Sequence, residues 1–224
     1  MDKKIAVLTG GTSGIGMQTA LALKSAGYTV YELSRRAQGV EGLNHLVADV
    51  TDEAAVKKAV DEIVAREGKI DVLVNNAGFG ISGAVEFTKT EDAKRLFDTN
   101  FFGMVNMNRA VVPVMREAGQ GRIVNISSVA GQIPIPFQTY YSAAKAATNS
   151  YTMALANELR PYGVTVCAVQ PGDIKRALQR RAKRRSTATM STADASGARF
   201  PAWSMTSRPA WIPRSPENLS PMSP

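Results

Sequence analysis

A tyrosine and a lysine four residues apart, Tyr141 and Lys145, are the side chains of this sequence best suited to proton transfer. On a helix, residues at this spacing share a face, with Cβ atoms roughly 5–6 Å apart. A free phenol has a pKa of about 10, and a neighbouring cation lowers it by about 1–3 units. Tyr141 is therefore a candidate general acid/base, with Lys145 lowering its pKa. The pair alone is weak support, because Tyr and Lys at this spacing are common on solvated helix faces.

A glycine-rich turn near the N-terminus predicts a phosphate-binding site. It lies between an apolar run typical of a buried strand, residues 5–8, and a segment of helical composition, residues 17–26. Glycines permit the tight turn, the close approach of backbone to a pyrophosphate and the close packing of helix on sheet. The helix N-terminus adds free N–H groups and a partial positive charge. The residues predicted to bind a dinucleotide here are Gly10, Thr12, Ser13, Gly14, Ile15 and Gly16.

The residues after the second predicted strand, 28–33, indicate which dinucleotide. In dinucleotide-binding folds an acidic residue at this strand end binds the ribose of NAD, whereas an arginine suits the 2′-phosphate of NADP. Here the strand is followed by Ser34, Arg35 and Arg36, and a guanidinium can bind a phosphate bidentately. We therefore predict NADP(H) as the preferred cofactor, with NAD(H) as the alternative. Two solvated surface arginines are the competing interpretation.

The remaining pattern predicts an α/β fold with a doubly wound, Rossmann-like parallel sheet and helices on both faces. Further strands are expected at 44–48, 71–74, 122–126 and 164–169, and helices at 53–67, 91–118 and up to 159. Ligands of such sheets bind outside the carboxyl ends of the strands. Residues at those ends join the predicted cofactor site: Asp49, Val50, Asn76, Ala77, Gly78, Pro171 and Gly172.

Composition narrows the class of protein further. No apolar run reaches the roughly 18 residues that span a membrane, and no signal peptide precedes the first strand. The single cysteine, Cys167, allows no internal disulfide, which fits a reducing cytoplasm, and we expect it to be a small core residue. The sole histidine, His45, is expected to be a partly exposed bystander. With no second histidine and no cysteine partner, no metal site is predicted.

The net charge of +8 does not indicate a nucleic-acid partner, because it is unevenly distributed. From Arg176 onward there are nine Lys/Arg and two Asp/Glu, so residues 1–175 are nearly neutral. The basic charge belongs to the tail and carries no information about what the domain binds. We expect a small-molecule substrate as the partner of the domain.

Taken together and in order, these motifs resemble the short-chain dehydrogenase/reductase family over about residues 3–175. The motif positions are the Gly10–Gly16 turn, Asn75–Gly78, Asn100, Ser128, Tyr141 with Lys145, and Pro171-Gly172. The resemblance implies an NAD(P)-dependent oxidoreductase that transfers a hydride between nicotinamide and a carbonyl or secondary alcohol.

The resemblance also implies individual roles for the catalytic residues. Tyr141 would exchange a proton with the substrate oxygen, and Ser128 would orient that oxygen. Lys145 would lower the pKa of Tyr141 and bind the nicotinamide ribose, and Asn100 would anchor a water that leads protons to Lys145. Ser127 would point to the other side of its strand, by the two-residue period. Tyr140, which lacks a lysine four residues on, is assigned to packing or the pocket wall.

Apolar residues between the motifs indicate the kind of substrate. The loop 131–139 and the segment Phe79-Gly80-Ile81 are apolar and flank the predicted reaction centre. They favour a mainly apolar ketone or secondary alcohol, with ordinary core packing as the alternative. Two further functions stay open: a catalytically impaired nucleotide-binding protein, and a different activity at the same site, such as epimerisation.

The resemblance ends near Arg176. Residues 176–185 are strongly basic, and 186–224 are rich in Ser, Thr and Pro, with six of the eleven prolines in the last 24 residues. This composition predicts a disordered tail without a seventh strand. We interpret the change as a frameshift near residue 176. Loss of the family's C-terminal segment would leave the sixth strand exposed, impair activity and argue against a family-like homo-oligomer.

Overall fold

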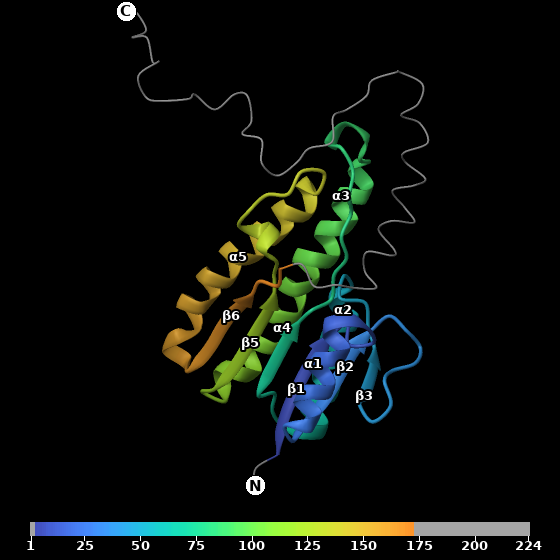
Figure 1. Cartoon of the computed structure of the whole chain (residues 1–224). Helices are drawn as coiled ribbons and strands as arrows, with labels where there is room; N and C mark the ends of the chain where they lie inside the picture. The colour runs from blue at the N-terminus through green and yellow to red at the C-terminus, as the bar shows by residue number, and fades with distance from the viewer. Residues whose placement is uncertain (1–2, 173–224) are drawn as a thin grey trace, which may run out of the picture. The chain divides into compact units, whose positions relative to one another are not determined.

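The structure, a computed structural model, describes residues 3–172 (Figure 1). Its centre is a parallel sheet in the order β3-β2-β1-β4-β5-β6. This confirms the predicted α/β, Rossmann-like class. The strands are β1 (Lys4–Thr9), β2 (Tyr28–Ser34), β3 (Asn44–Val47), β4 (Val72–Asn75), β5 (Gly121–Ile126) and β6 (Val164–Val169). The predicted domain boundary at 175 and the tail 176–224 lie outside the described residues.

Five α-helices connect these strands, together with shorter turns. The α-helices are α1 (Gly14–Ser25), α2 (Glu53–Glu67), α3 (Thr90–Phe97), α4 (Gly103–Glu117) and α5 (Thr139–Leu159). Short 3-10 turns lie at Val85–Phe87, Val129–Gly131 and Arg160–Tyr162. The predicted helix 91–118 is therefore not one regular helix: a π-helical turn, Asp98–Phe102, separates α3 from α4. Among residues 3–172, no helix is both long and apolar enough to cross a membrane.

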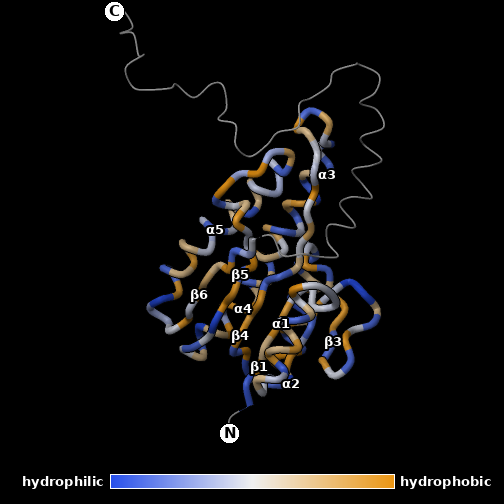
Figure 2. Tube along the Cα trace, in the orientation of Figure 1, coloured by the Kyte–Doolittle hydropathy of each residue, from blue (hydrophilic) through white to orange (hydrophobic). Residues whose placement is uncertain are grey.

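Two hydrophobic layers place helices on both faces of the sheet. On one face, Ala6 and Leu8 of β1 pack with Ala20 of α1. On the other, Ile5 and Val7 belong to a larger core that contains residues of α2, α4 and α5. The two-residue period of a strand explains why adjacent residues of β1 enter different layers. Figure 2 shows hydrophobic residues concentrated along the central strands.

The connection from β2 to β3 contains no helix. Residues 35–43 form a loop that is largely exposed, so the alternation of strand and helix is broken at this point. Helix α2 begins after β3, where the Asp52 side chain accepts a hydrogen bond from the Ala55 N–H, as expected of an N-cap. The loop matters for function because it begins with the two arginines predicted to recognise the cofactor.

The prediction that Cys167 is a core residue is wrong. β6 is an edge strand of the described sheet, and Cys167 is exposed on it. Val164, three residues before Cys167 and therefore on the opposite face of β6, is buried in the core shared with α5. Alternation along β6 therefore turns Cys167 to the face away from that helix, and an apolar neighbourhood in sequence does not bury a residue on an edge strand.

Candidate active site

The carboxyl ends of β1 and β4 are joined by a side chain that the sequence analysis did not single out. Thr9, the last residue of β1, is buried, and its Oγ1 accepts hydrogen bonds of 3.0 Å from the Asn76 and Ala77 N–H groups. In return the Asn76 side chain donates to the Thr9 carbonyl at 3.0 Å and to the Gly10 carbonyl at 3.2 Å. These bonds bring Gly10 and the 76–78 segment together at the strand ends, as predicted.

The glycine-rich turn depends on its glycines. Gly10 and Gly14 have φ of 69° and 60°, in the left-handed region that favours glycine. A Cβ on Gly16 would lie 2.3 Å from the Gly10 carbonyl oxygen and 2.4 Å from Asn76 Nδ2. Gly16 therefore allows α1 to begin directly against the turn, which is closer than simple helix-on-sheet packing requires.

The N-terminus of α1 is suited to bind an anion. Ser13 is the N-cap residue, but its side chain makes no capping hydrogen bond, and the first turn of the helix holds no acidic residue. The backbone N–H groups of the first turn are thus free of side-chain competition. Together with Thr12 and Ile15, which flank Ser13 and Gly14, they form a cradle that fits a phosphate group.

The end of β2 also fits a ligand. The Ser34 hydroxyl is buried and has no hydrogen-bond partner in the structure, although buried polar atoms are normally paired. Arg35 follows with its side chain 75% exposed, and its Nη1 lies 3.8 Å from Asp49 Oδ2. Arg36 is also exposed. An unpaired buried hydroxyl is thus followed in the chain by two exposed arginines, a combination that suits recognition of a ribose phosphate.

The residues after β3 form an ordered turn next to the predicted cofactor site. Asp49 Oδ1 accepts hydrogen bonds from the Thr51 N–H and hydroxyl, which orders the turn into α2. Val50 is buried, and its carbonyl accepts from Asn106 Nδ2 at 3.0 Å. Asp49 therefore lies at the predicted site with one carboxylate oxygen toward Arg35, whereas the Val50 side chain belongs to the core.

Tyr141 and Ser128, from α5 and the end of β5, are brought together as predicted. The Ser128 hydroxyl lies close enough to the Tyr141 phenol to lower its pKa. The Ser128 hydroxyl also accepts from the Ala130 N–H at 3.2 Å, which fixes its position. Ser127 points elsewhere, as expected, and donates to the Lys145 carbonyl at 3.2 Å.

The electrostatics of Tyr141 differ from the prediction. Burial raises the pKa of the phenol above its ordinary value, and the nearby Ser128 hydroxyl lowers it by less. The Lys145 ammonium donates to the Ile126 carbonyl at 2.7 Å and lies 5.7 Å from the centre of the Tyr141 ring. Lys145 is buried, and burial lowers its own pKa to about 8. The expected acidification of Tyr141 by Lys145 is therefore not found in this arrangement, because desolvation of the phenol dominates.

Asn100 lies in the π-helical turn, which accounts for its place inside a helix. Its Oδ1 accepts from the Phe79 N–H at 2.9 Å, and its Nδ2 donates to the Phe79 carbonyl at 2.8 Å. A Cβ on Gly78 would lie 3.0 Å from Asn100 Oδ1, so Gly78 permits this approach. The side chain thus holds the Phe79 backbone. Since both polar atoms of the Asn100 side chain are bonded to Phe79, a water at Asn100 would have to bind its backbone carbonyl. In a π turn the backbone hydrogen bonds differ from the regular α-helical pattern.

A buried amide cluster beneath the site was not predicted. Asn75 Nδ2 donates to the side-chain oxygens of Asn108 and Asn125, at 2.8 and 2.9 Å. Asn125 in turn donates to Thr152 of α5 at 2.9 Å. The cluster links β4, β5, α4 and α5 below the catalytic side chains. Sequence offered only the pair Asn75-Asn76 as a signal.

Further segments approach Tyr141 from the substrate side. A Cβ on Gly80 would lie 3.9 Å from Tyr141 Cδ2, and the Gly83 N–H donates to the Phe137 carbonyl at 2.8 Å. Ile133 and Phe137 are 70% and 65% exposed. At the end of β6, the Pro171 carbonyl accepts from the Val129 N–H at 3.2 Å, next to Ser128, and Gly172 follows with open space around it.

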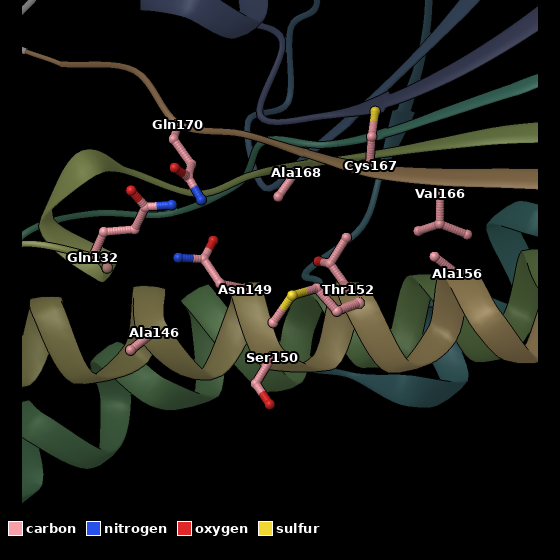
Figure 3. A pocket seen from close by; sticks show the side chains of 12 residues that line it. Gln132, Ala146, Asn149, Ser150, Thr152, Ala156, Val166, Cys167, Ala168 and Gln170 are labelled. Atoms are coloured by element: carbon pink, nitrogen blue, oxygen red, sulfur yellow. The ribbon is translucent and has the colours of Figure 1, made fainter.

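A separate pocket of about 440 Å³ lies between α5 and β6 (Figure 3). Gln132, Asn149 and Gln170 turn their amide groups toward one end of it, and the Cys167 sulfur lies on the side of β6 away from α5. None of the four predicted catalytic residues lines this pocket. The candidate reaction centre is therefore the group of side chains around Tyr141 at the strand ends and not this pocket.

Comparisons with known proteins agree with this geometry. A family profile described as short chain dehydrogenase matches residues 4–187. A curated relative from Bacteroides thetaiotaomicron, named 3-ketodihydrosphingosine reductase, is 46% identical over 174 residues, which cover 77% of this chain and 65% of the relative. The chain therefore spans slightly less than two thirds of that relative's length.

Two solved structures show the same fold with different cofactors. One, titled ElxO with NADP bound, has a TM-score of 0.76 and 34% identity and covers 82% of this chain and 79% of its own. The other, an NAD+-bound xylitol dehydrogenase, has a TM-score of 0.74 and 32% identity, and the match covers 80% of this chain and 74% of the xylitol dehydrogenase chain. With a Rossmann-like sheet, a glycine-rich turn and a paired serine and tyrosine at one set of strand ends, the chain belongs to the short-chain dehydrogenase/reductase family of oxidoreductases.

Proposed function

We propose that the protein is an NADP(H)-dependent carbonyl reductase that acts on a mainly apolar ketone. The observation that carries this proposal is the proximity of Ser128 and Tyr141, placed beside the buried Lys145 at the strand ends. A bound NADPH would supply the hydride. The residues that fit it are the cradle at the start of α1, the unpaired Ser34 hydroxyl, and Arg35 with Arg36 at the ribose phosphate.

The proton chemistry is supplied by the chain itself. Because burial raises its pKa, Tyr141 stays protonated at neutral pH and can donate its phenolic proton to a substrate oxygen. Ser128, fixed by the Ala130 N–H, would hold the same substrate oxygen. Lys145 would stabilise the phenolate left behind and bind the nicotinamide ribose. Asn100 as the anchor of a water remains part of the proposal.

The substrate class is argued from the rim of the crevice. Ile133 and Phe137 expose apolar side chains on the loop between Ser128 and Tyr141, and Gly80 faces the Tyr141 ring. The Bacteroides relative is named as a reductase of a keto compound, 3-ketodihydrosphingosine. We therefore propose a ketone that carries an apolar chain.

The cofactor part is tested by measuring dissociation constants for NADPH and NADH by fluorescence titration. Arg35→Ala should weaken NADPH binding by about 10- to 100-fold, the value of one charge-assisted hydrogen bond to phosphate, and leave NADH binding unchanged. The matched control is Arg66→Ala, which removes an exposed arginine of α2 paired with Glu62. Equal losses for both cofactors would contradict the proposed preference.

The chemical part is tested by loss of NADPH absorbance with a panel of ketones that includes 3-ketodihydrosphingosine. Turnover that increases with the length of the apolar chain is the expected result. Tight NADPH binding without turnover of any ketone would overturn the reductase proposal and leave a nucleotide-binding protein in its place.

A further inference from the structure

A buried carboxylate lies directly behind the glycine-rich turn. Glu32 of β2 has no exposed surface, and its Oε1 accepts a hydrogen bond of 3.0 Å from the Gly11 N–H. A Cβ on Gly11 would lie 2.3 Å from the Glu32 side chain, so glycine at 11 makes room for this carboxylate. An unbalanced negative charge here would oppose the binding of phosphates at the same turn.

His45 is the partner of that carboxylate and not a bystander. It lies opposite Glu32 in the register of β2 and β3, and its Nδ1 is 2.6 Å from Glu32 Oε2. Its Nε2 is 2.8 Å from the carbonyl oxygen of Arg36. A Cβ on Gly39 would lie 2.4 Å from His45 Cβ, so the 35–43 loop closes tightly over the histidine. One imidazole ring thus connects the glycine-rich turn, through Glu32, to the segment that carries the two arginines.

The two contacts of His45 require a shared proton. The Arg36 carbonyl can only accept, so Nε2 must carry a hydrogen. Nδ1 and Glu32 Oε2 then need one more proton between them, either as imidazolium with carboxylate or as imidazole with carboxylic acid. When that proton is lost, the lone pair of Nδ1 faces a lone pair of Glu32 Oε2 if Nε2 keeps its hydrogen. The ring can then keep only one of its two hydrogen bonds, to Glu32 or to the Arg36 carbonyl. A net negative charge also remains behind the glycine-rich turn.

We propose that His45 is a positioning residue whose proton, shared with Glu32, keeps the Arg35–Arg36 segment and the glycine-rich turn arranged for NADP(H), so that affinity for NADP(H) falls as the pH rises. The charged groups around the ring are consistent with this role. Glu32 is the titratable side chain in contact with it. Lys24 of α1 approaches Gly42 in the same loop, and Arg35 pairs with Asp49. The inference rests on the proposed function, because it concerns the NADP(H) phosphate end of that site.

The test is the ratio of NADPH to NADH affinity from pH 5.5 to pH 9, in the full chain without a histidine tag. The ratio removes effects shared by both nucleotides, including titration of Lys145. In the unaltered protein the preference for NADPH should fall by about five- to tenfold as pH rises, a typical coupling between linked sites. The 2′-phosphate of NADPH loses its second proton near pH 6, and the added negative charge should raise the preference for NADPH as pH rises. This opposite effect is the same in all variants.

Two variants distinguish the effect of the shared proton from the effect of side-chain packing. A glutamine at position 45 cannot hold the shared proton, so the preference of His45→Gln for NADPH should be low. Its only change with pH should be the one caused by titration of the NADPH 2′-phosphate. Glu32→Gln can donate its amide hydrogen to a neutral Nδ1 while Nε2 still donates to Arg36. This variant should therefore keep a high preference at every pH. A purely structural role for His45 would instead weaken both variants at all pH values.

A spectroscopic readout is available because His45 is the only histidine. Its ring nitrogens give unambiguous 15N signals, and the Nδ1 signal should change at the pH where the NADPH preference falls, because Nδ1 loses either its proton or its hydrogen bond from Glu32 there. Ring signals that do not change between pH 5.5 and pH 9, or a His45→Gln profile identical to that of the unaltered protein while NADPH still binds, would overturn the inference alone. Failure of the unaltered protein to bind either nucleotide at any pH would overturn the proposed function and this inference together.

Discussion

At the scale of single residues, the site consists of polar groups whose properties are set by burial. Tyr141 and Lys145 are close together, yet the ammonium is directed to the Ile126 carbonyl and both groups are desolvated. Desolvation disfavours the charged form of each, which raises the pKa of the phenol and lowers that of the amine. The proposed role of the phenol as a proton donor is consistent with this direction of its pKa.

Tyr141→Phe removes the phenolic proton and keeps the ring. We expect ketone reduction to fall by about 10²–10⁴, the usual contribution of general acid catalysis, with the NADPH dissociation constant unchanged within about twofold. Steady-state rates and fluorescence titration measure the two effects. Tyr140→Phe is the matched control, since it alters the neighbouring tyrosine that has no lysine four residues on. A Tyr141→Phe protein that keeps its activity would remove Tyr141 from the mechanism.

Lys145→Met should stabilise the fold while it abolishes activity. The pKa of Lys145 is lowered from 10.5 to about 8, so below pH 8 the folded protein contains a disfavoured buried charge. Allowing for the lost hydrogen bond to Ile126, we expect a gain of about 1–2 kcal/mol in the free energy of unfolding at pH 7.

The sign of the pH dependence follows from proton linkage. Between pH 8 and 10.5 the unfolded chain binds more protons at Lys145 than the folded chain, so the unaltered protein gains stability as pH rises through this window. The advantage of Lys145→Met should therefore shrink there. Urea unfolding at several pH values measures it, and a constant difference would contradict the lowered pKa.

At the scale of elements, three local irregularities build the site. The glycine-rich turn joins β1 to α1, a π-helical turn separates α3 from α4, and a loop without a helix joins β2 to β3. Each irregularity places a functional group: the N–H groups of α1, Asn100 against Phe79, and the arginines after Ser34. A regular helix or strand at any of the three would direct these groups elsewhere.

Gly16→Ala tests the turn at its most crowded position. The added Cβ would meet the Gly10 carbonyl at 2.3 Å, so either the turn or α1 must move. We expect NADPH binding to weaken at least tenfold and the fold to lose about 1–3 kcal/mol, as in overpacked cores. Gln18→Ala, an exposed change in the same helix, is the control. Normal nucleotide binding by Gly16→Ala would show that the turn is not the phosphate site.

At the scale of the whole molecule, the described sheet ends at β6, whose outer edge makes no strand pair. Val169 is 45% exposed and Cys167 is exposed on the same strand face. Unpaired edges with apolar residues favour association with other chains. The segment from about residue 176, interpreted above as frameshifted, follows this strand in the chain and lies outside the described residues.

Cys167 reports directly on that edge. As the single cysteine, it should react with one equivalent of a thiol reagent in the native protein within minutes, because its side chain is accessible. Cys167→Ser is the blank. If labelling occurred only after unfolding in urea, the β6 face would be covered in solution.

Sequence reasoning predicted most of the fold correctly because its signals are local. Apolar runs, glycines and caps act within a few residues, so strands and helices were placed to within a few positions. The parallel direction of the strands followed from the alternation of most strands with helices, whereas the strand order was not predicted. The family resemblance carried by Gly10–Gly16, Ser128, Tyr141 and Lys145 was also visible in the sequence, and the family profile confirms it. The break at Asp98–Phe102 was not, since a π turn has no strong sequence signal.

The tertiary structure decided what each polar group faces. Cys167 looked like a core residue and is exposed, because strand order put β6 at an edge. His45 looked like a bystander, but the pairing of β2 with β3 puts it against Glu32. Tyr141 was expected to be acidic, but its burial, which depends on distant segments, raises its pKa. Residue types and spacing are properties of the chain, whereas solvation and partners across strands exist only once distant segments have packed.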